Sequence, residues 1–399
     1  MMETKYTEIP FTWPQGFKAD GVHAGLRKAK LDMGWLYSAQ PAAAAGVYTT
    51  NQFQAAPTKL TKKTINQQHQ LQAIVLNSAN ANSCTGAQGE QDAAQMQQLA
   101  AIKLGLNADL VGVASTGIIG ELLPMDVIAA GIEQLQLTDN TKVTEAVLTT
   151  DTHAKTVAVT CQIDGKTVTL SGFCKGSGMI HPNMATMLGF VTTDAAIDGM
   201  LLQQLLSQAT DTTFNQITVD GDTSTNDMVT VLANGAAGNT PLTTASTDYE
   251  TFVAAFTYVL GELAKKIAAD GEGATKLVAV TVAGAWSDFE GQQVAKAIVG
   301  SNLVKAAIYG EDPNWGRIMV AIGQTDAHLD LTAVDVTLNE LPLIQNSQAA
   351  TTEVSKLTAA LAEKVINVAV ELHNGTGQGQ AWGCDLTYDY VKINATYHS

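Results

Sequence analysis

KGSGMIHPNMATMLGFVTTD, residues 175–194, is the most unusual stretch of this 399-residue chain. It opens with a glycine-bearing loop, passes through a histidine-proline-asparagine sequence and reaches Thr186. The apolar run Met187–Val191 follows directly and predicts a buried strand. We therefore expect the hydroxyl of Thr186 at the entrance of a core strand, directly after a conformationally constrained loop.

A threonine at the start of a strand is ordinary by itself, because β-branched residues suit strands and their hydroxyls bond locally. It becomes a nucleophile when a base lies beside its hydroxyl, and its own α-amine, once released, is one such base. That amine has a pKa of roughly 7.7–8.0, so a good fraction is neutral at a working pH near that value. Cleavage of the backbone before Thr186 would create this amine, but composition alone leaves open whether the cut happens.

Composition and charge narrow the class of protein. Hydrophobic residues make up 46% and charged residues 15%, as in a compact globular protein long enough for two domains. The formal net charge is −16 with no basic run to offset it, so nucleic acid and anionic membranes are poor partners. No apolar run approaches the length of a membrane span, and the start of the sequence resembles neither a signal nor a transit peptide. The four cysteines are far apart without metal-ligand spacing, which indicates reduced thiols, a cytoplasmic protein and no structural metal.

Predicted strands and helices alternate along the sequence. Apolar β-branched runs predict buried strands at residues 73–76, 110–114, 156–160, 277–282 and 318–322. Helical periodicity predicts helices at residues 91–106, 124–135, 201–209 and 249–269. The alternation indicates an α/β protein of several layers. The loops between these elements contain neither a Walker A sequence nor a GxGxxG turn, so they give little support to nucleotide binding.

The stretch KGSGMIHPNMATM closely resembles the cleavage-site signature of the ornithine acetyltransferase (glutamate N-acetyltransferase) family. The resemblance covers almost the whole chain through further blocks in family order: TTNQFQAAP (49–57), NSANANSCTG (77–86), STGIIGELLP (115–124), TTDT (149–152), DGDTSTND (220–227), GEGATK (271–276), GEDPNWGRI (310–318) and WGCDLTYDYVKINATY (382–397). The clearest departure is Ala79, where the family pattern has glycine. It lies outside the residues assigned to chemistry, so we expect it to affect only the geometry of a turn.

The resemblance implies an α/β fold, a layered αββα sandwich like that of N-terminal-nucleophile hydrolases. It also implies that the chain cuts itself between Ala185 and Thr186, giving an α chain of residues 1–185 and a β chain of residues 186–399. In this scheme the Thr186 hydroxyl attacks the Ala185 carbonyl, and water opens the resulting ester. The same hydroxyl then serves as the catalytic nucleophile, in a heterotetramer of two α and two β chains.

Thr116 and Gly117 match the oxyanion-hole pair of the family. A tetrahedral oxyanion needs hydrogen-bond donors already aimed at it, which is often the largest electrostatic contribution to acyl transfer. A purely structural interpretation is a turn after the strand at 110–114, in which Gly117 supplies freedom in φ. The two interpretations are compatible, because N–H groups at the end of a strand point outward.

The remaining site residues follow from the resemblance as substrate contacts. Lys175 would bind the α-carboxylate that donor and acceptor share, and Glu272 would hold a substrate ammonium. Thr149, Asn394 and Ser399 match further contacts, together with Thr186 itself. Without the resemblance, Lys175 and Glu272 would be ordinary loop charges and the last residues a frayed tail. With it, residues 388–399 are predicted as a strand followed by an ordered end.

The implied reaction is ping-pong transfer of an acetyl group in arginine biosynthesis. N-acetylornithine acetylates Thr186 and ornithine leaves; glutamate then takes the acetyl group and departs as N-acetylglutamate. No metal or tightly bound cofactor is required. Some family members also use acetyl-CoA as donor, and no residue of this sequence decides between the two kinds. An amide hydrolase or aminopeptidase of the same self-cleaving fold is the alternative, and a non-enzymatic binding protein is a more distant one.

Overall fold

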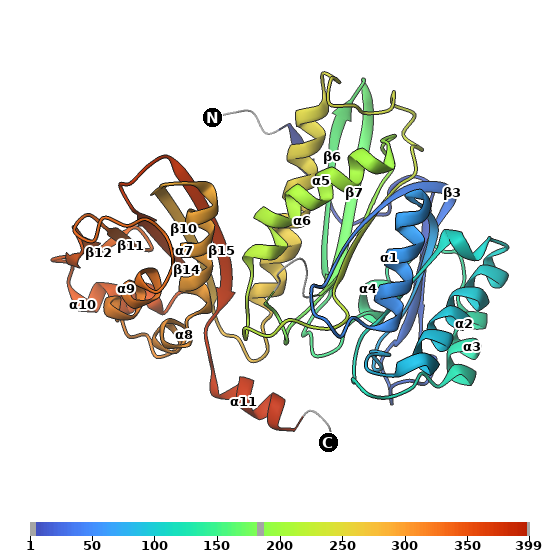
Figure 1. Cartoon of the computed structure of the whole chain (residues 1–399), viewed down its shortest axis with the longest axis horizontal. Coiled ribbons are helices and arrows are strands. Elements are labelled where there is room, and N and C mark those ends of the chain that lie inside the picture. The colour runs from blue at the N-terminus through green and yellow to red at the C-terminus, as the bar shows by residue number, and fades with distance from the viewer. Residues whose placement is uncertain (1–4, 182–186, 397–399) are drawn as a thin grey trace. The chain divides into compact units, whose positions relative to one another are not determined.

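The computed structural model describes residues 5–181 and 187–396, and these form two compact units. Among the described residues, the first unit holds those up to Gly176 together with 187–214 and 223–263. The second unit holds 177–181, 215–222 and the residues from Ala264 onward. Each unit has its own β-sheet (Figure 1). Each also draws residues from both sides of the predicted cut, so the compact units differ from the predicted α and β chains.

The first unit is built on a nine-stranded sheet in the order β1-β6-β7-β8-β9-β3-β4-β5, with β2 paired to β3. The β4–β5 and β8–β9 pairs are parallel and the other pairs are antiparallel. Its strands are β1 (Tyr6–Glu8), β2 (Phe17–Val22), β3 (Met33–Tyr48), β4 (Gln70–Asn77), β5 (Val111–Ser115), β6 (Lys155–Ile163), β7 (Lys166–Lys175), β8 (Leu188–Thr193) and β9 (Met228–Ala233).

Apolar cores cover both faces of this sheet, which explains why its central strands are continuous apolar runs. Trp35 and Val75 pack with α2 and α3 on one face, while Phe190 and Met228 belong to the core on the other face. The helical elements are α1 (Ala56–Gln68), α2 (Gly86–Leu104), η1 (Ala108–Leu110), α3 (Met125–Gln134), α4 (Val143–Ala146), α5 (Gly199–Thr212), η2 (Phe214–Gln216) and α6 (Tyr249–Ala269). Both η2 and α6 cross from the first unit into the second.

The second unit contains a six-stranded sheet in the order β13-β12-β11-β14-β10-β15. Valines of β10 and β14 pack against α7 and α9 in its core. Its strands are β10 (Leu277–Ala285), β11 (Asp335–Leu338), β12 (Leu341–Gln345), β13 (Gln348–Ala349), β14 (Val365–Glu371) and β15 (Gly377–Cys384). Its helices are α7 (Asp288–Gly300), α8 (Asn302–Tyr309), α9 (Trp315–Gly323), α10 (Val354–Leu361) and α11 (Tyr388–Ala395).

The predicted α/β class with two sheets is confirmed, and two local expectations are wrong. Residues 318–322 form part of helix α9 instead of a strand. Ile318, Ala321 and Ile322 are buried while Val320 is 62% exposed, which is the 3–4 residue spacing of a helix face. Residues 388–395 form helix α11 instead of a strand, and the Thr387 hydroxyl caps it by accepting the Tyr390 N–H at 3.4 Å.

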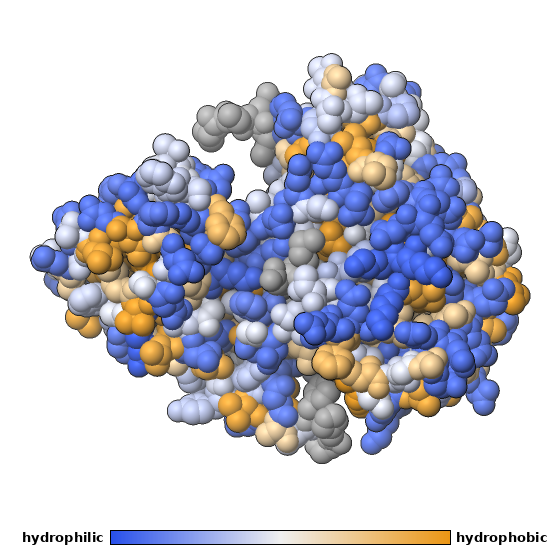
Figure 2. All heavy atoms as spheres, viewed as in Figure 1, coloured by the Kyte–Doolittle hydropathy of each residue, from blue (hydrophilic) through white to orange (hydrophobic). Residues whose placement is uncertain are grey.

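Within residues 5–181 and 187–396, no helix combines the length and the apolar character that a membrane crossing needs. The face seen in Figure 2 is largely hydrophilic, with hydrophobic side chains gathered in small patches.

Candidate active site

The strands on either side of the predicted cut are neighbours in one sheet. Ala185 and Thr186, like Ser399, lie outside the described residues. β7 ends at Lys175, β8 begins at Leu188, and these two residues are directly paired in an antiparallel ladder. Strand β8 therefore begins two residues after the predicted nucleophile, as the apolar run predicts.

Lys175 and Thr116 meet through their side chains. The Lys175 Nζ donates a hydrogen bond to Thr116 Oγ1 at 3.0 Å. The backbone N–H of Thr116 is already used, because it donates to the Asn77 carbonyl at 3.1 Å. Thr116 thus offers its hydroxyl, which accepts from Lys175 and keeps its own proton to donate elsewhere. This is the arrangement required of an oxyanion-hole hydroxyl.

Gly117 is the second predicted donor, and its backbone conformation and close backbone neighbours leave room only for glycine. Its φ is +133°, and a Cβ there would lie 2.1 Å from the Ala79 carbonyl carbon. Within the part of the chain that the structure describes, its N–H donates to no acceptor. Ala79 itself has φ 83°, which explains why glycine is expected there. Ala79 therefore lies against the backbone of the predicted oxyanion turn, and its substitution for glycine concerns the geometry of that turn, as expected.

Asparagine side chains hydrogen bond to the backbone around this turn. Ser115 Oγ donates to Asn77 Oδ1 at 2.6 Å, and Asn77 Nδ2 donates to the Asn80 carbonyl at 2.9 Å. Asn226 Nδ2 donates to the carbonyls of Ala81 and Ser115 at 2.6 and 2.8 Å. These buried amides bind backbone carbonyls, so they help to fix the loop that presents Gly117.

A buried ion pair supports the same region and was not predicted from the sequence. Asp151 Oδ1 accepts from Lys155 Nζ at 2.6 Å and from the Gly176 N–H at 2.7 Å. Asp151 Oδ2 accepts the N–H of Thr149 at 3.0 Å, which ties this predicted substrate contact to the pair. Burial raises the pKa of Asp151, but the Lys155 and Lys175 charges and the Gly176 N–H outweigh it, and the pKa falls to about 2. Asp151 is therefore an ionised carboxylate that anchors the start of the Lys175 loop.

Asp227 is a second buried carboxyl that the sequence did not single out. Burial raises the pKa of this group well above its usual range, although the Lys175 charge opposes the shift. Its Oδ2 is buried and has no hydrogen-bond partner among residues 5–181 and 187–396. The next residue, Met228, donates its N–H to the Met187 carbonyl at 2.8 Å. Asp227 thus precedes the strand that pairs with the segment directly following the predicted nucleophile.

The second unit brings together two other predicted substrate contacts. Asn394, on α11, donates from Nδ2 to Glu272 Oε2 at 2.7 Å. Glu272 is buried, and its N–H donates to the Ser177 carbonyl at 3.0 Å. A Cβ on Gly178 would lie 2.3 Å from the Glu272 carboxyl carbon, so a larger residue there would require the Glu272 carboxylate to move. The predicted site residues are accordingly divided between the units, with Thr116, Gly117, Thr149 and Lys175 in the first and Glu272 and Asn394 in the second.

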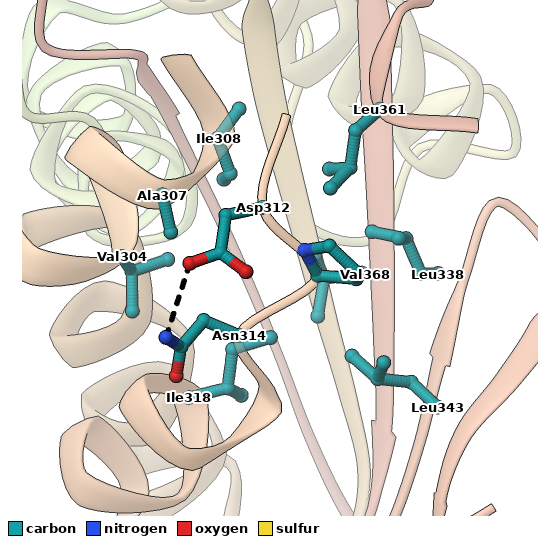
Figure 3. Close-up of a pocket in the computed structure, with 11 residues that line it drawn as sticks. Val304, Ala307, Ile308, Asp312, Asn314, Ile318, Leu338, Leu343, Leu361 and Val368 are labelled. Carbon is teal, nitrogen blue, oxygen red and sulfur yellow. Dashed lines mark hydrogen bonds between the residues drawn. The ribbon is translucent and has the colours of Figure 1, made fainter. Parts of the chain in front are cut away.

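A pocket in the second unit lies among α8, α9, α10 and the sheet, and it contains none of the predicted site residues (Figure 3). Its lining is mostly apolar, and its polar side chains, Asp312 and Asn314, are hydrogen bonded to each other at 3.1 Å. The GEDPNWGRI block therefore has a structural explanation as a turn between two helices. Within the described ranges, no group of three or more His, Cys, Asp or Glu residues is placed to hold a metal ion.

Comparison with known proteins gives one consistent answer. The model of the ArgJ family matches residues 18–399. The arginine biosynthesis bifunctional protein ArgJ of Lactiplantibacillus plantarum is 62% identical over 399 residues, covering 100% of this chain and 99% of that protein. The protein of the same name from Staphylococcus epidermidis is 51% identical over 385 residues, covering 96% and 97%. A crystal structure of ArgJ from Bacillus halodurans is 52% identical with a TM-score of 0.52, and it covers 53% of this chain and 100% of that chain.

Proposed function

This chain belongs to the ArgJ family, and we infer from that membership that it is a bifunctional acetyltransferase of arginine biosynthesis, an ornithine acetyltransferase and a glutamate N-acetyltransferase. It transfers the acetyl group of N2-acetyl-L-ornithine to L-glutamate. Its second activity takes the acetyl group from acetyl-CoA. Neither reaction calls for a bound metal.

We further propose the roles of individual residues. The chain cuts itself between Ala185 and Thr186, and the released α-amine assists the Thr186 hydroxyl as a nucleophile. The hydroxyl attacks the acetyl carbonyl, ornithine leaves with the proton, and glutamate's amine later takes the acetyl group from the ester. Thr116 Oγ1 and the Gly117 N–H donate to the tetrahedral oxyanion in both steps.

The observation that carries this proposal is the bond from Lys175 to the Thr116 hydroxyl. It directs the Thr116 proton away from the lysine, in a turn where the Gly117 N–H has no acceptor among the described residues. Two donors are therefore set before any substrate arrives, which is how an oxyanion hole lowers a barrier. The same ammonium is proposed to attract a substrate α-carboxylate by its charge.

Substrate recognition is completed by Thr149, Glu272, Asn394 and Ser399. Glu272 already accepts a hydrogen bond from Asn394 and would accept others from a substrate ammonium. The enzyme works in the cytoplasm as a heterotetramer of two α and two β chains. In support of the two-chain form, the Bacillus halodurans structure is matched in full by about half of this chain, a share close to that of residues 186–399.

One experiment separates transfer from the alternative of amide hydrolysis. Purified protein is incubated with N2-acetylornithine, with and without glutamate, and N-acetylglutamate and free acetate are measured. We expect N-acetylglutamate only with glutamate, little acetate in either case, and neither product from Thr186→Ala. Release of acetate at the same rate without glutamate would identify a hydrolase.

A further inference from the structure

The segment Ser177–His181 ends four residues before the predicted bond to be cut, and hydrogen bonds hold it within the second unit. The Ser177 hydroxyl donates to the Asp270 carbonyl at 2.7 Å. The Ser177 carbonyl in turn accepts the N–H of Glu272 at 3.0 Å. Hydrogen bonds thus hold both the side chain and the carbonyl of Ser177, the first residue of the segment.

The middle of the segment is held by one carboxylate, that of Asp220. Its Oδ2 accepts the N–H of Met179 at 2.6 Å and its Oδ1 accepts the N–H of Ile180 at 2.8 Å. Met179 has φ 57°, so the two successive N–H groups converge on one side of the chain. Such a concave pair of N–H groups is a binding site for an anion, and here the Asp220 carboxylate occupies it. Bonds to an ionised acceptor are about twice as strong as neutral ones.

The end of the segment pairs with the residues just before Asp220. The Ile180 carbonyl accepts the Val219 N–H at 2.7 Å and the Thr218 hydroxyl at 3.1 Å. Because that hydroxyl gives its proton to Ile180, His181 Nδ1 must donate to it, at 3.0 Å. Burial, aided by the Lys296 charge, lowers the pKa of His181 to about 4, so the ring is neutral at neutral pH.

We propose that Asp220 is a positioning residue for self-cleavage, whose carboxylate fixes the backbone conformation from which the chain is cut. This inference rests on the proposed cut between Ala185 and Thr186. Attack of a hydroxyl on the preceding carbonyl depends on backbone geometry, and a misplacement of about 1 Å can cost about 100-fold in rate. Asp220 holds two consecutive peptide units of the segment that precedes the cut, so we expect it to restrict the backbone conformations from which attack can occur.

Asp220 also links this segment to α11. Tyr390 OH donates to Asp220 Oδ2 at 3.3 Å. Burial and the charge of Asp220 raise the pKa of the Tyr390 phenol, which keeps it a donor. The carboxylate is therefore itself held by a second element, as a positioning group needs to be.

The test compares Asp220→Asn with Asp222→Asn. An asparagine at 220 can accept one of the two N–H bonds, but its own NH₂ then opposes the other. Asp222 is exposed, and its substitution makes the same charge change two residues away while leaving its backbone N–H bond to Asp220. Uncut protein is made by brief expression, and cutting is followed on denaturing gels. We expect Asp220→Asn to slow cutting about 10- to 100-fold and Asp222→Asn to match the parent.

Two further readouts separate positioning from general damage. Hydroxylamine cleaves an ester, so it should fail to release the two pieces from Asp220→Asn if Asp220 acts before the ester forms. Transfer by the fraction that does become cut should change far less than the cutting rate. Should Asp220→Asn fail to fold, Asp220→Glu is measured in the same way, since it keeps the charge and displaces the carboxylate.

The outcomes are distinct. Cutting of a folded Asp220 variant at the parental rate overturns the inference while leaving the proposed function intact. Equal slowing in Asp222→Asn also overturns it, because net charge would then explain the effect. A fully active parent that never becomes cut would instead overturn the proposed self-cleavage, on which this inference rests, while leaving the transfer activity in place.

Discussion

Ala79 and Gly117 are packed backbone against backbone, so that a Cβ on Gly117 would lie 2.1 Å from the Ala79 carbonyl carbon. The Ile118 N–H also donates to the Ala79 carbonyl at 3.0 Å. The predicted oxyanion donor is therefore held in place by a residue that is itself in a left-handed conformation, with φ 83°.

Replacing Ala79 with glycine should stabilise the protein by about 0.5–1 kcal/mol. The strain of an L-residue at positive φ is relieved, and the greater freedom of glycine in the unfolded chain offsets part of the gain. Urea unfolding of uncut Thr186→Ala protein with and without this change measures it. Ala81→Gly is the control, because the structure gives Ala81 no positive φ and it should lose stability. A lower urea midpoint with Ala79→Gly than without it would contradict the backbone strain assigned to Ala79.

Thr116→Ala should lower kcat by about 10²–10³ with little change in KM, since the hydroxyl is proposed to act only on the developing oxyanion. Lys175→Ala should weaken both half-reactions. Because Lys175 donates to the Thr116 hydroxyl, the losses in the double variant should be smaller than the product of the single losses. Steady-state kinetics of the four proteins decide this, and a loss confined to KM would make Thr116 a substrate contact instead.

Removing Lys155 should destabilise the protein strongly. Lys155→Met removes the cation that donates directly to the buried Asp151 carboxylate, at a cost of about 3–5 kcal/mol. Lys155→Met combined with Asp151→Asn should recover much of that loss, because no buried charge remains. Chemical unfolding of the uncut chain measures both. Equal stability of Lys155→Met and the parent would exclude an energetic role for the pair.

The ion pair of Asp151 and Lys155 also predicts how the stability of the fold depends on pH. The folded pKa of Asp151, about 2, lies below its usual value of 3.8. Ionised Asp151 therefore stabilises the fold fully above about pH 4, and this contribution is lost as the pH falls from there towards 2. Thermal melts between pH 6 and 2.5 should show a loss in the parent that is smaller in Asp151→Asn. Parallel curves for the two proteins would assign the acid sensitivity to other groups.

Purified protein should run as two chains on a denaturing gel. Dividing the 41.9 kDa chain after Ala185 gives pieces of roughly 19 and 22 kDa, each of a size usual for a compact unit. The larger piece should begin Thr-Met-Leu-Gly-Phe. Thr186→Ala should remain whole and inactive, while Thr186→Ser should keep some of both activities. Transfer by the alanine variant would show that another residue is the nucleophile.

The sequence predicted those parts of the fold that depend on local pattern. The long periodic segment at 249–269 coincides with α6, and the run at 73–76 lies within β4. The run Ile318–Ile322 was assigned wrongly because five consecutive apolar residues look alike in a buried strand and a buried helix. Only the observed burial, with Val320 outward, reveals the period.

What the sequence could not predict is mostly long-range contact. Asp220 meets Met179 across 41 residues, and Asn226 meets Ser115 across 111. The ion pair of Asp151 and Lys155 is close in sequence, but only burial makes it important. The family blocks did indicate where these residues lie: Asp151 is in TTDT, and Asp220, Asn226 and Asp227 are in DGDTSTND. The blocks did not indicate what these side chains do, because that depends on the groups that they contact in the fold.

The pairing of β7 with β8 means that folding should have a different reaction order before and after the cut. Lys175–Leu188 and the pairs up to Leu170–Thr193 join strands that the proposed cleavage assigns to different chains. The uncut chain forms this ladder within one molecule. After cleavage, two molecules must find each other to form it, so recovery of denatured enzyme should depend on protein concentration whereas that of Thr186→Ala should not. Self-cleavage would thus make a protein that folds once as a monomer and can refold only by association.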